Sequence, residues 1–251
     1  MSSLTISLVA FAFIFGGALA GMILRPSLPD HHLSAESKEV VKLGMGLVGT
    51  MAALILGLLV ASAKTSFDAQ SSELTQASAN IVVLDRVLAQ YGPETREVRE
   101  LLRGAVARII EDTWSHGRHA SSQFGGASTS NGIMLEKIQA LSAETEFQRA
   151  IKSQAWNMAL NLGQTRWLLY EQGTTSVSKP MVVIMVFWLT IVFVSWGLLA
   201  PRNATVVATL FTAALSVSGA IFLILEMYNP YRGVIQISNA PMQSALALLG
   251  Q

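Results

Sequence analysis

The chain has 251 residues, of which 51% are hydrophobic and only 13% are charged, and its formal net charge is +1. A soluble domain usually has about 25% charged residues, so this composition argues against a soluble protein and favours a membrane protein. The chain contains no cysteine, which excludes disulfides, thiol catalysis and thiolate metal sites.

Four apolar runs without a charged side chain come in two pairs, one towards each end of the chain. Each run has roughly 19 to 22 residues, which as a helix spans about 30 Å, the thickness of the hydrocarbon core of a bilayer. Residues 1–5 contain no Lys or Arg, which favours a membrane helix over a cleaved signal peptide for the first run. The predicted transmembrane helices are Leu4–Leu24, Leu43–Ala63, Met181–Leu199 and Ala204–Leu225.

The second run is predicted to continue as a helix beyond the membrane surface. Residues 64–90 contain no glycine or proline, and apolar side chains recur there at the spacing of a heptad seam. Ser34 is a suitable N-cap ahead of the run, and Gly92 and Pro93 are suited to end the helix. We therefore predict a continuous helix from Lys42 to Gln90. Its seam residues are Phe67, Leu74, Ile81 and Leu88.

The polar stretch between the two pairs carries twelve basic and twelve acidic residues from Lys64 to Lys179, so it has no basic patch for nucleic acid. One amphipathic helix is predicted from Pro93 to Trp114. A long helix is predicted from Ile133 to Glu171, after a loop rich in Gly and Ser. The expected fold is an all-α membrane protein with four transmembrane helices, two plus two, and a three-helix antiparallel insertion outside the membrane.

We divide the chain into four segments on these grounds. Residues 1–63 hold the first two transmembrane helices, residues 64–179 the insertion, and residues 180–226 the third and fourth transmembrane helices. The last segment, residues 227–251, is expected to form a turn, a short strand and a helix. The strand is expected at Val234–Ile237 and the helix at Pro241–Leu249.

Small residues repeat every four positions along the second transmembrane run, a spacing that lets helix backbones approach closely in lipid. One interpretation is helix packing within a single subunit. The other is that this helix lines the central axis of an oligomer, where its small and apolar side chains form a narrow constriction. The pore-lining or helix-packing candidates are Gly46, Gly49, Thr50, Ala53, Gly57 and Ala61.

None of the four runs contains an ionisable side chain. This disfavours a proton-driven motor or pump, which needs an intramembrane titratable group, but it allows a channel with an apolar gate. Glu226, at the end of the fourth run, is expected to be an interfacial carboxylate in water or near Arg232. The alternative is that Glu226 and Arg232 lie at the mouth of a pore.

Histidines occur in two short polar stretches. His116 and His119 are three residues apart, but the neighbouring Gly117 favours solvated loop residues over a metal site. The pair His31 and His32 is a weaker candidate still. No catalytic or nucleotide-binding motif is present, so the sequence predicts no enzyme, no metal and no cofactor.

Several motifs resemble, in the same order, those of a bacterial membrane family known as bestrophin-like. They are His32–Ser37 followed by Gly44–Thr50, Leu54–Leu58, Ala63–Lys64, Leu84–Leu88, Tyr91–Glu94, Leu101–Arg103 and Tyr228–Gly233. The resemblance implies that a set of motif residues has a structural role in this family. They are Asp85, Arg86, Tyr91, Gly92, Pro93, Arg103, Pro230 and Gly233.

The resemblance implies the layout of bestrophins, which have four spans, cytosolic termini and a helical cytosolic insertion between spans two and three. Bestrophins assemble as pentameric anion channels with span two at the pore. For this chain the resemblance therefore implies a multi-pass protein of the bacterial inner membrane, a homo-oligomer in the lipid bilayer, and a small anion as its partner. Basic residues are nearly balanced across the two sides, so the orientation comes from the resemblance alone.

The leading hypothesis is an oligomeric, bestrophin-like anion channel whose second transmembrane helix lines the axis. The alternative is a non-conducting, membrane-anchored helical scaffold whose insertion docks another protein. A symmetric oligomer with the second span at its centre favours the channel. A second span buried among the helices of its own chain favours the scaffold.

Overall fold

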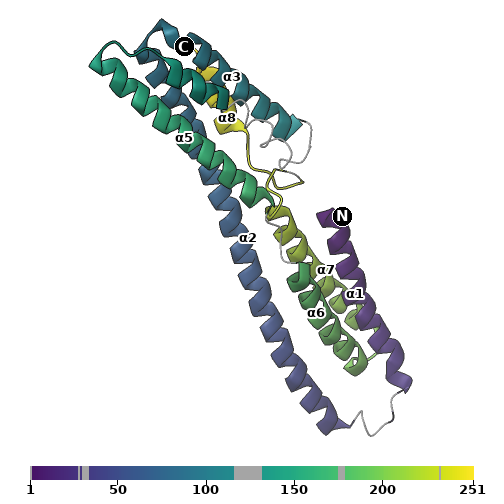
Figure 1. Ribbon diagram of the computed structural model, residues 1–251. Coiled ribbons are helices and arrows are strands. Elements are labelled where there is room, and N and C mark those ends of the chain that lie inside the picture. The colour runs from purple at the N-terminus through teal and green to yellow at the C-terminus, as the bar shows by residue number, and fades with distance from the viewer. Residues whose placement is uncertain (1, 28, 30–33, 116–131, 175–178, 232) are drawn as a thin grey trace. The chain divides into compact units, whose positions relative to one another are not determined.

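The computed structural model describes all residues except 1, 28, 30–33, 116–131, 175–178 and 232. The described residues form helices and no strand (Figure 1). In chain order these are α1 (Ser3–Leu24), η1 (Arg25–Ser27), α2 (Ala35–Tyr91), η3 (Pro93–Thr95), α3 (Arg96–Ile110), the π-helical η4 (Glu111–Ser115), α5 (Glu146–Thr174), α6 (Lys179–Leu199), α7 (Ala204–Met227) and α8 (Ala240–Leu248). Residues 132–140 are also helical.

Among these residues, four helices are long and apolar enough to cross a membrane. They are Ser3–Ser27, Ala35–Tyr91, Pro180–Leu199 and Ala204–Met227, and each contains one of the predicted runs. The expected all-α membrane protein with four transmembrane helices is therefore confirmed.

The chain forms two compact units. The membrane unit consists of Met1–Thr65 and Ser176–Tyr228, with α1, α6, α7 and the first part of α2. The insertion unit consists of Ser66–Thr175 and Asn229–Gln251, with the rest of α2 and with α3, α5 and α8. The last segment of the chain thus joins the insertion unit, although the third and fourth spans precede it in sequence.

Helix α2 is continuous over 57 residues, which confirms the predicted extension beyond the second span. The amide of Ser37 donates to the hydroxyl of Ser34 at 3.2 Å, so Ser34 is the N-cap expected from the sequence. In the insertion unit the seam residues Leu74, Ile81 and Leu88 are 4%, 6% and 0% exposed. They belong to one hydrophobic core with residues of α3, α5 and the C-terminal segment.

In the membrane unit α1 packs against α6 and α7. Glycines let α1 and α6 meet backbone to backbone. A Cβ atom built on Gly197 would overlap the carbonyl oxygen of Ala18, and one built on Gly21 would overlap that of Val194. Gly17 and Gly21 of α1 therefore serve helix packing within the chain.

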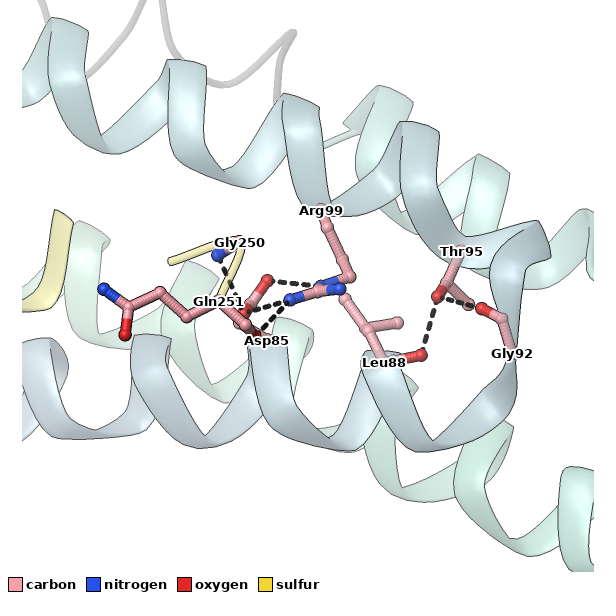
Figure 2. Close-up of polar contacts among 7 residues, drawn as sticks. All are labelled: Asp85, Leu88, Gly92, Thr95, Arg99, Gly250 and Gln251. Atoms are coloured by element: carbon pink, nitrogen blue, oxygen red, sulfur yellow. Dashed lines mark hydrogen bonds and ion pairs between the residues drawn. The ribbon is translucent and has the colours of Figure 1, made fainter. Parts of the chain in front are cut away.

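The corner between α2 and α3 depends on Gly92 and Thr95 (Figure 2). Gly92 has φ of 135°, a region that favours glycine, so it ends α2 as expected. The Thr95 hydroxyl lies within hydrogen-bond distance of two carbonyl oxygens, at 2.6 Å from that of Leu88 and at 2.9 Å from that of Gly92. These contacts satisfy carbonyl groups that the end of a helix leaves without intrahelical partners.

The helix predicted over residues 133–171 is interrupted. Residues 132–140 are helical, and α5 begins only at Glu146. Thr145 and Gln148 form a capping box: the Gln148 amide donates to the Thr145 hydroxyl at 3.1 Å, and the Thr145 amide donates to the Gln148 side chain at 3.3 Å. Lys152 donates to the carbonyl of Leu141 at 2.7 Å. These local bonds end one helix and start another.

The strand expected at Val234–Ile237 is wrong, because residues 233–238 have no strand conformation. The amide of Ile237 donates to the carbonyl of Pro230 at 2.8 Å, and the carbonyl of Ile237 accepts from the indole N–H of Trp114 at 2.9 Å. The segment thus meets its hydrogen-bonding needs in a turn and a side-chain contact. The helix that follows, α8, agrees with the prediction to within one residue at each end.

Candidate functional site

The spanning part of α2 is the least buried of the four membrane helices. Only 11% of its most apolar window is buried, against 39% for the first span, 33% for the third and 28% for the fourth. Its buried side chains are Ala52, Leu59 and Ala63, which lie on one line along the helix at about 100° per residue. Most of the remaining surface of this span is open in the single chain.

The predicted small-residue candidates lie on this open surface. Gly46, Thr50, Ala53, Gly57 and Ala61 are exposed, and Gly49 is half-buried. A Cβ atom built on any of the three glycines would meet no other atom within 4 Å, leaving aside the helix's own backbone. Packing within one chain therefore explains Gly17 and Gly21 of α1 and Gly197 of α6, but it does not account for the glycines of α2.

Two neighbouring stripes divide the open face of α2. At about 100° per residue, Gly46, Ala53 and Gly57 lie roughly 120° from the buried line in one direction. Leu47, Leu54 and Leu58 lie roughly 140° from it in the other direction, and they are 64%, 70% and 69% exposed. We call these the small-residue stripe and the leucine stripe.

The open face offers no chemistry for proton transfer or catalysis. Residues 43–63 contain no ionisable side chain, and the Thr50 hydroxyl donates to the carbonyl of Leu47 at 2.8 Å within the helix. Such a face can pack against another helix or border an aqueous path that apolar side chains close by excluding water.

The two pore-mouth candidates have different outcomes. Glu226 is only 5% exposed, so it does not lie in water, which was one of the two surroundings expected from the sequence. Close to it in the chain, the hydroxyls of Tyr228 and Ser62 are 3.3 Å apart. Arg232 lies outside the described residues.

Asp85, one of the family-motif residues, forms a buried ion pair with Arg99 (Figure 2). Arg99 donates from Nε to Oδ1 of Asp85 at 2.7 Å and from Nη2 to Oδ2 at 2.8 Å. The amide of Gly250 donates to the same carboxylate at 3.3 Å, and Arg99 also donates to the carbonyl of Gln251 at 3.4 Å. The pair therefore ties α2, α3 and the C-terminal segment together in the insertion unit.

The surroundings of the pair keep it charged. Burial acts to raise the pKa of Asp85, but the hydrogen bonds from Arg99 and Gly250 and the charge of Arg99 hold that pKa below its usual value. The hydrogen bond to Asp85 raises the pKa of Arg99 despite its partial burial. This is a structural site, since it holds three segments together.

The other motif residues have structural roles or lie at the surface. Tyr91 is buried, Pro93 begins η3, and Gly233 has φ of 97°. Arg86 and Arg103 are exposed. The arginine that pairs with Asp85 is Arg99, which is not among the family-motif residues. The sequence contains one signal for this pair. Asp85 precedes the Gly-Pro corner, and Arg99 follows it, by about the same number of residues.

The described residues contain no group of three or more His, Asp or Glu side chains suited to a metal ion. The histidine pairs of the sequence, His31–His32 and His116–His119, lie outside the described residues.

Comparisons with known proteins give the chain its relatives. A bestrophin-like domain is matched by residues 12–242. No functionally curated protein matches the chain. Among solved structures, a bacterial bestrophin homologue from Klebsiella pneumoniae carrying one substitution is similar with a TM-score of 0.71 and 12% identity, over 99% of this chain and 97% of that chain. Another variant of the homologue gives a TM-score of 0.70 and 12% identity, over 96% and 97%.

A further solved membrane protein gives a TM-score of 0.65 and 11% identity, over 98% of this chain and 99% of that chain. At such low identity these likenesses show the fold alone. The domain match covers most of the sequence, and the resemblance seen in the motifs of the chain is thereby confirmed. The chain belongs to the bestrophin-like family of membrane proteins.

Proposed function

We propose that the chain is one subunit of an oligomeric anion channel, in which α2 of each copy lines a shared axis. Bestrophins are anion channels, and this chain belongs to the bestrophin-like family and shares the fold of bacterial homologues. The observation that carries the proposal is the open face of α2, whose glycines have no packing role within the chain.

The two stripes have separate roles in this proposal. Without side chains at Gly46 and Gly57, the small-residue stripe lets α2 of a neighbouring copy approach closely, which stabilises helix pairs in lipid. The leucine stripe beside it then borders the axis, where rings of Leu47, Leu54 and Leu58 narrow the path and exclude water when closed. Anions pass only when the rings separate enough to admit water.

The same resemblance supports a cellular location and an orientation in the membrane. We place the protein in the bacterial inner membrane with the insertion unit and both termini in the cytoplasm. Four spans put the termini and the insertion on one side. Because the chain has no cysteine, a single cysteine at the exposed Ser72 provides the check. A membrane-impermeant maleimide should label it only after the cells are opened.

The test of conduction is chloride current through the purified protein in planar bilayers. Gly57→Leu adds a bulky side chain to the small-residue stripe and is expected to reduce the current severalfold or abolish it. Gly16→Leu is the matched control, because Gly16 is an exposed glycine on α1 whose added Cβ also meets no atom within 4 Å. It should leave the current unchanged.

Disulfide trapping tests the oligomer independently of current. Cysteine at Gly57 should give an oxidised dimer in native membranes, whereas cysteine at Gly16 should not. A well-folded oligomer that traps through Gly57 but passes no anion in bilayers contradicts the channel and leaves the scaffold. Absence of trapping at Gly57 contradicts the central position of α2.

A further inference from the structure

The insertion unit contains a partly open cavity of about 100 Å³ that the proposed channel function does not use. Its walls come from the extension of α2, from α3, η4 and α5, and from the C-terminal segment. Ile81, Val106, Leu162 and Met242 are among the apolar side chains that line it. An apolar cavity of about 150 Å³ holds benzene, so this partly open cavity, about two thirds as large, suits an alkyl chain of about four carbons.

One buried hydroxyl in the wall lacks a partner. Tyr231 is 8% exposed and lines the cavity, and its hydroxyl has no hydrogen-bond partner in the described part of the chain. Burial, together with the charge of Glu73, raises the pKa of Tyr231 to about 12, so the group keeps its proton and remains a donor. A buried donor without a partner is unfavourable, and a bound acceptor would satisfy it.

The other polar groups of the wall determine the kind of acceptor. The indole ring of Trp114 packs edge-on against Tyr231 at 5.9 Å, but its N–H already donates to the carbonyl of Ile237. Arg166 of α5 also lines the cavity and brings a positive charge to it. Burial lowers the pKa of Arg166, which is the effect of a cation with reduced access to water.

We propose that this cavity binds a small aliphatic carboxylate, with its alkyl chain among the apolar side chains and its carboxylate near Tyr231 and Arg166. A hydroxyl donor and a guanidinium together select an anionic acceptor. The apolar walls select a body without further polar groups. Glu73 acts against an anion beside Tyr231, so the charge of Arg166 is required for binding.

Methionine methyl groups provide the measurement. The full-length protein, labelled with ¹³C at its methionine methyls, is placed in nanodiscs of neutral lipid and titrated with sodium pentanoate. Met134 and Met242 line the cavity, whereas Met22 and Met185 lie in the membrane unit and report any partition into lipid. We expect saturable shifts of the first two signals at millimolar pentanoate, with Met22 and Met185 unmoved. Pentylammonium, which has the same chain and the opposite charge, should give no saturable shift.

Two substitutions locate the site. Tyr231→Phe removes only the hydroxyl and should weaken pentanoate binding about tenfold, as for the loss of a hydrogen bond to a charged group. Tyr91→Phe is its matched control, because the Tyr91 hydroxyl is also buried without a partner but does not line the cavity. It should leave the affinity unchanged. Ala105→Leu fills the cavity and should abolish binding.

The proposal is overturned if neither cavity signal shifts saturably, if pentylammonium shifts them equally, or if Tyr231→Phe binds pentanoate as well as Tyr91→Phe does. Tyr231→Phe decides the question even where Ala105→Leu does not fold. None of these outcomes depends on conduction, so the cavity and the channel stand or fall separately.

Discussion

At the scale of single residues, the ion pair of Asp85 and Arg99 contributes most clearly to the stability of the insertion unit. The Asp85 side chain is 3% exposed and that of Arg99 is 22% exposed. By contrast, Arg96 and Glu100 form a surface pair whose side chains are 85% and 69% exposed. Surface pairs add little to stability, whereas removing one partner of a buried pair leaves a charge that water reaches poorly.

We expect Asp85→Asn to lower the free energy of unfolding at neutral pH by about 2 kcal/mol, less than for a fully buried pair because water reaches Arg99. The folded pKa of Asp85 lies below its unfolded value, so its stabilisation is present above about pH 4 and is lost as the pH falls through the folded pKa. The difference between the native protein and Asp85→Asn should therefore shrink in acid. Thermal unfolding followed by circular dichroism from neutral to acidic pH measures it.

Glu100→Gln is the control for this prediction, since it removes the carboxylate of the surface pair. It should change the stability by less than about 0.5 kcal/mol. A loss of stability as large as that of Asp85→Asn would contradict the importance of burial. A difference for Asp85→Asn that stays constant into acid would contradict the assigned direction of the pKa.

At the scale of elements, the contact between α1 and α6 depends on the absence of side chains where the two backbones meet. Gly197→Ala places a Cβ against the carbonyl of Ala18, and backbone cannot give way as a flexible side chain can. We expect it to lower the stability of the membrane unit by about 1–3 kcal/mol, the usual range for overpacking. The fall in the unfolding temperature of the protein in detergent is the measurement.

Gly16→Ala is the control, because an added Cβ there meets no other atom within 4 Å and alanine favours the helix. Its unfolding temperature should equal or exceed that of the native protein. Equal destabilisation by both substitutions would mean that glycine flexibility, and not the close contact, is what α1 and α6 require.

Elements that depend on local signals were predictable from the sequence, and contacts between distant residues were not. The spans follow from apolar runs, and the length of α2 follows from its heptad seam between Ser34 and Gly92. The break before α5 also has a local signal, because Thr145 and Gln148 have the spacing of a capping box. The expected strand failed because β-branched residues at Val234–Ile237 favour a strand only where a partner strand exists.

The residues of the candidate site were predictable from the sequence, but their exposure was not. Small residues at the same spacing occur on α1 and on α2, and the sequence does not tell which are covered by the helices of their own chain. Gly21 is covered and Gly57 is open because of how α6 lies against α1. Similarly, Arg86, Arg99 and Arg103 all lie near Asp85 in sequence, but only the packing of α3 on α2 brings Arg99 within reach.

At the scale of the whole molecule, the C-terminal segment belongs to the insertion unit, although it is distant in sequence from the rest of that unit. The other part of the unit ends at Thr175, and the segment begins 54 positions later, at Asn229. Met242 and Leu249 are 4% and 3% exposed in the core of the insertion unit, and Gly250 donates to Asp85. Burying two such side chains contributes about 3–6 kcal/mol. The insertion unit therefore needs its C-terminal segment for stability.

Deleting residues 240–251 should leave a protein that enters the membrane but whose insertion unit is cut by trypsin many times faster. Digestion in nanodiscs followed by mass spectrometry locates the cuts. Val234→Ala is the control, because that side chain is 82% exposed, and its digestion should match that of the native protein. A truncated protein that resists trypsin as well as the native one would contradict the role of the segment.

The position of these last residues also sets an order of events during synthesis. Residues 66–175 are synthesised before α6 and α7, and at that stage the indole of Trp114 has no Ile237 carbonyl to bind and Asp85 has no Gly250 amide. The insertion unit must therefore wait, incomplete, until the second pair of membrane helices has been made. Folding of the insertion unit is thus coupled to the synthesis of residues 229–251, and a chain that stops before the third and fourth spans cannot close this core.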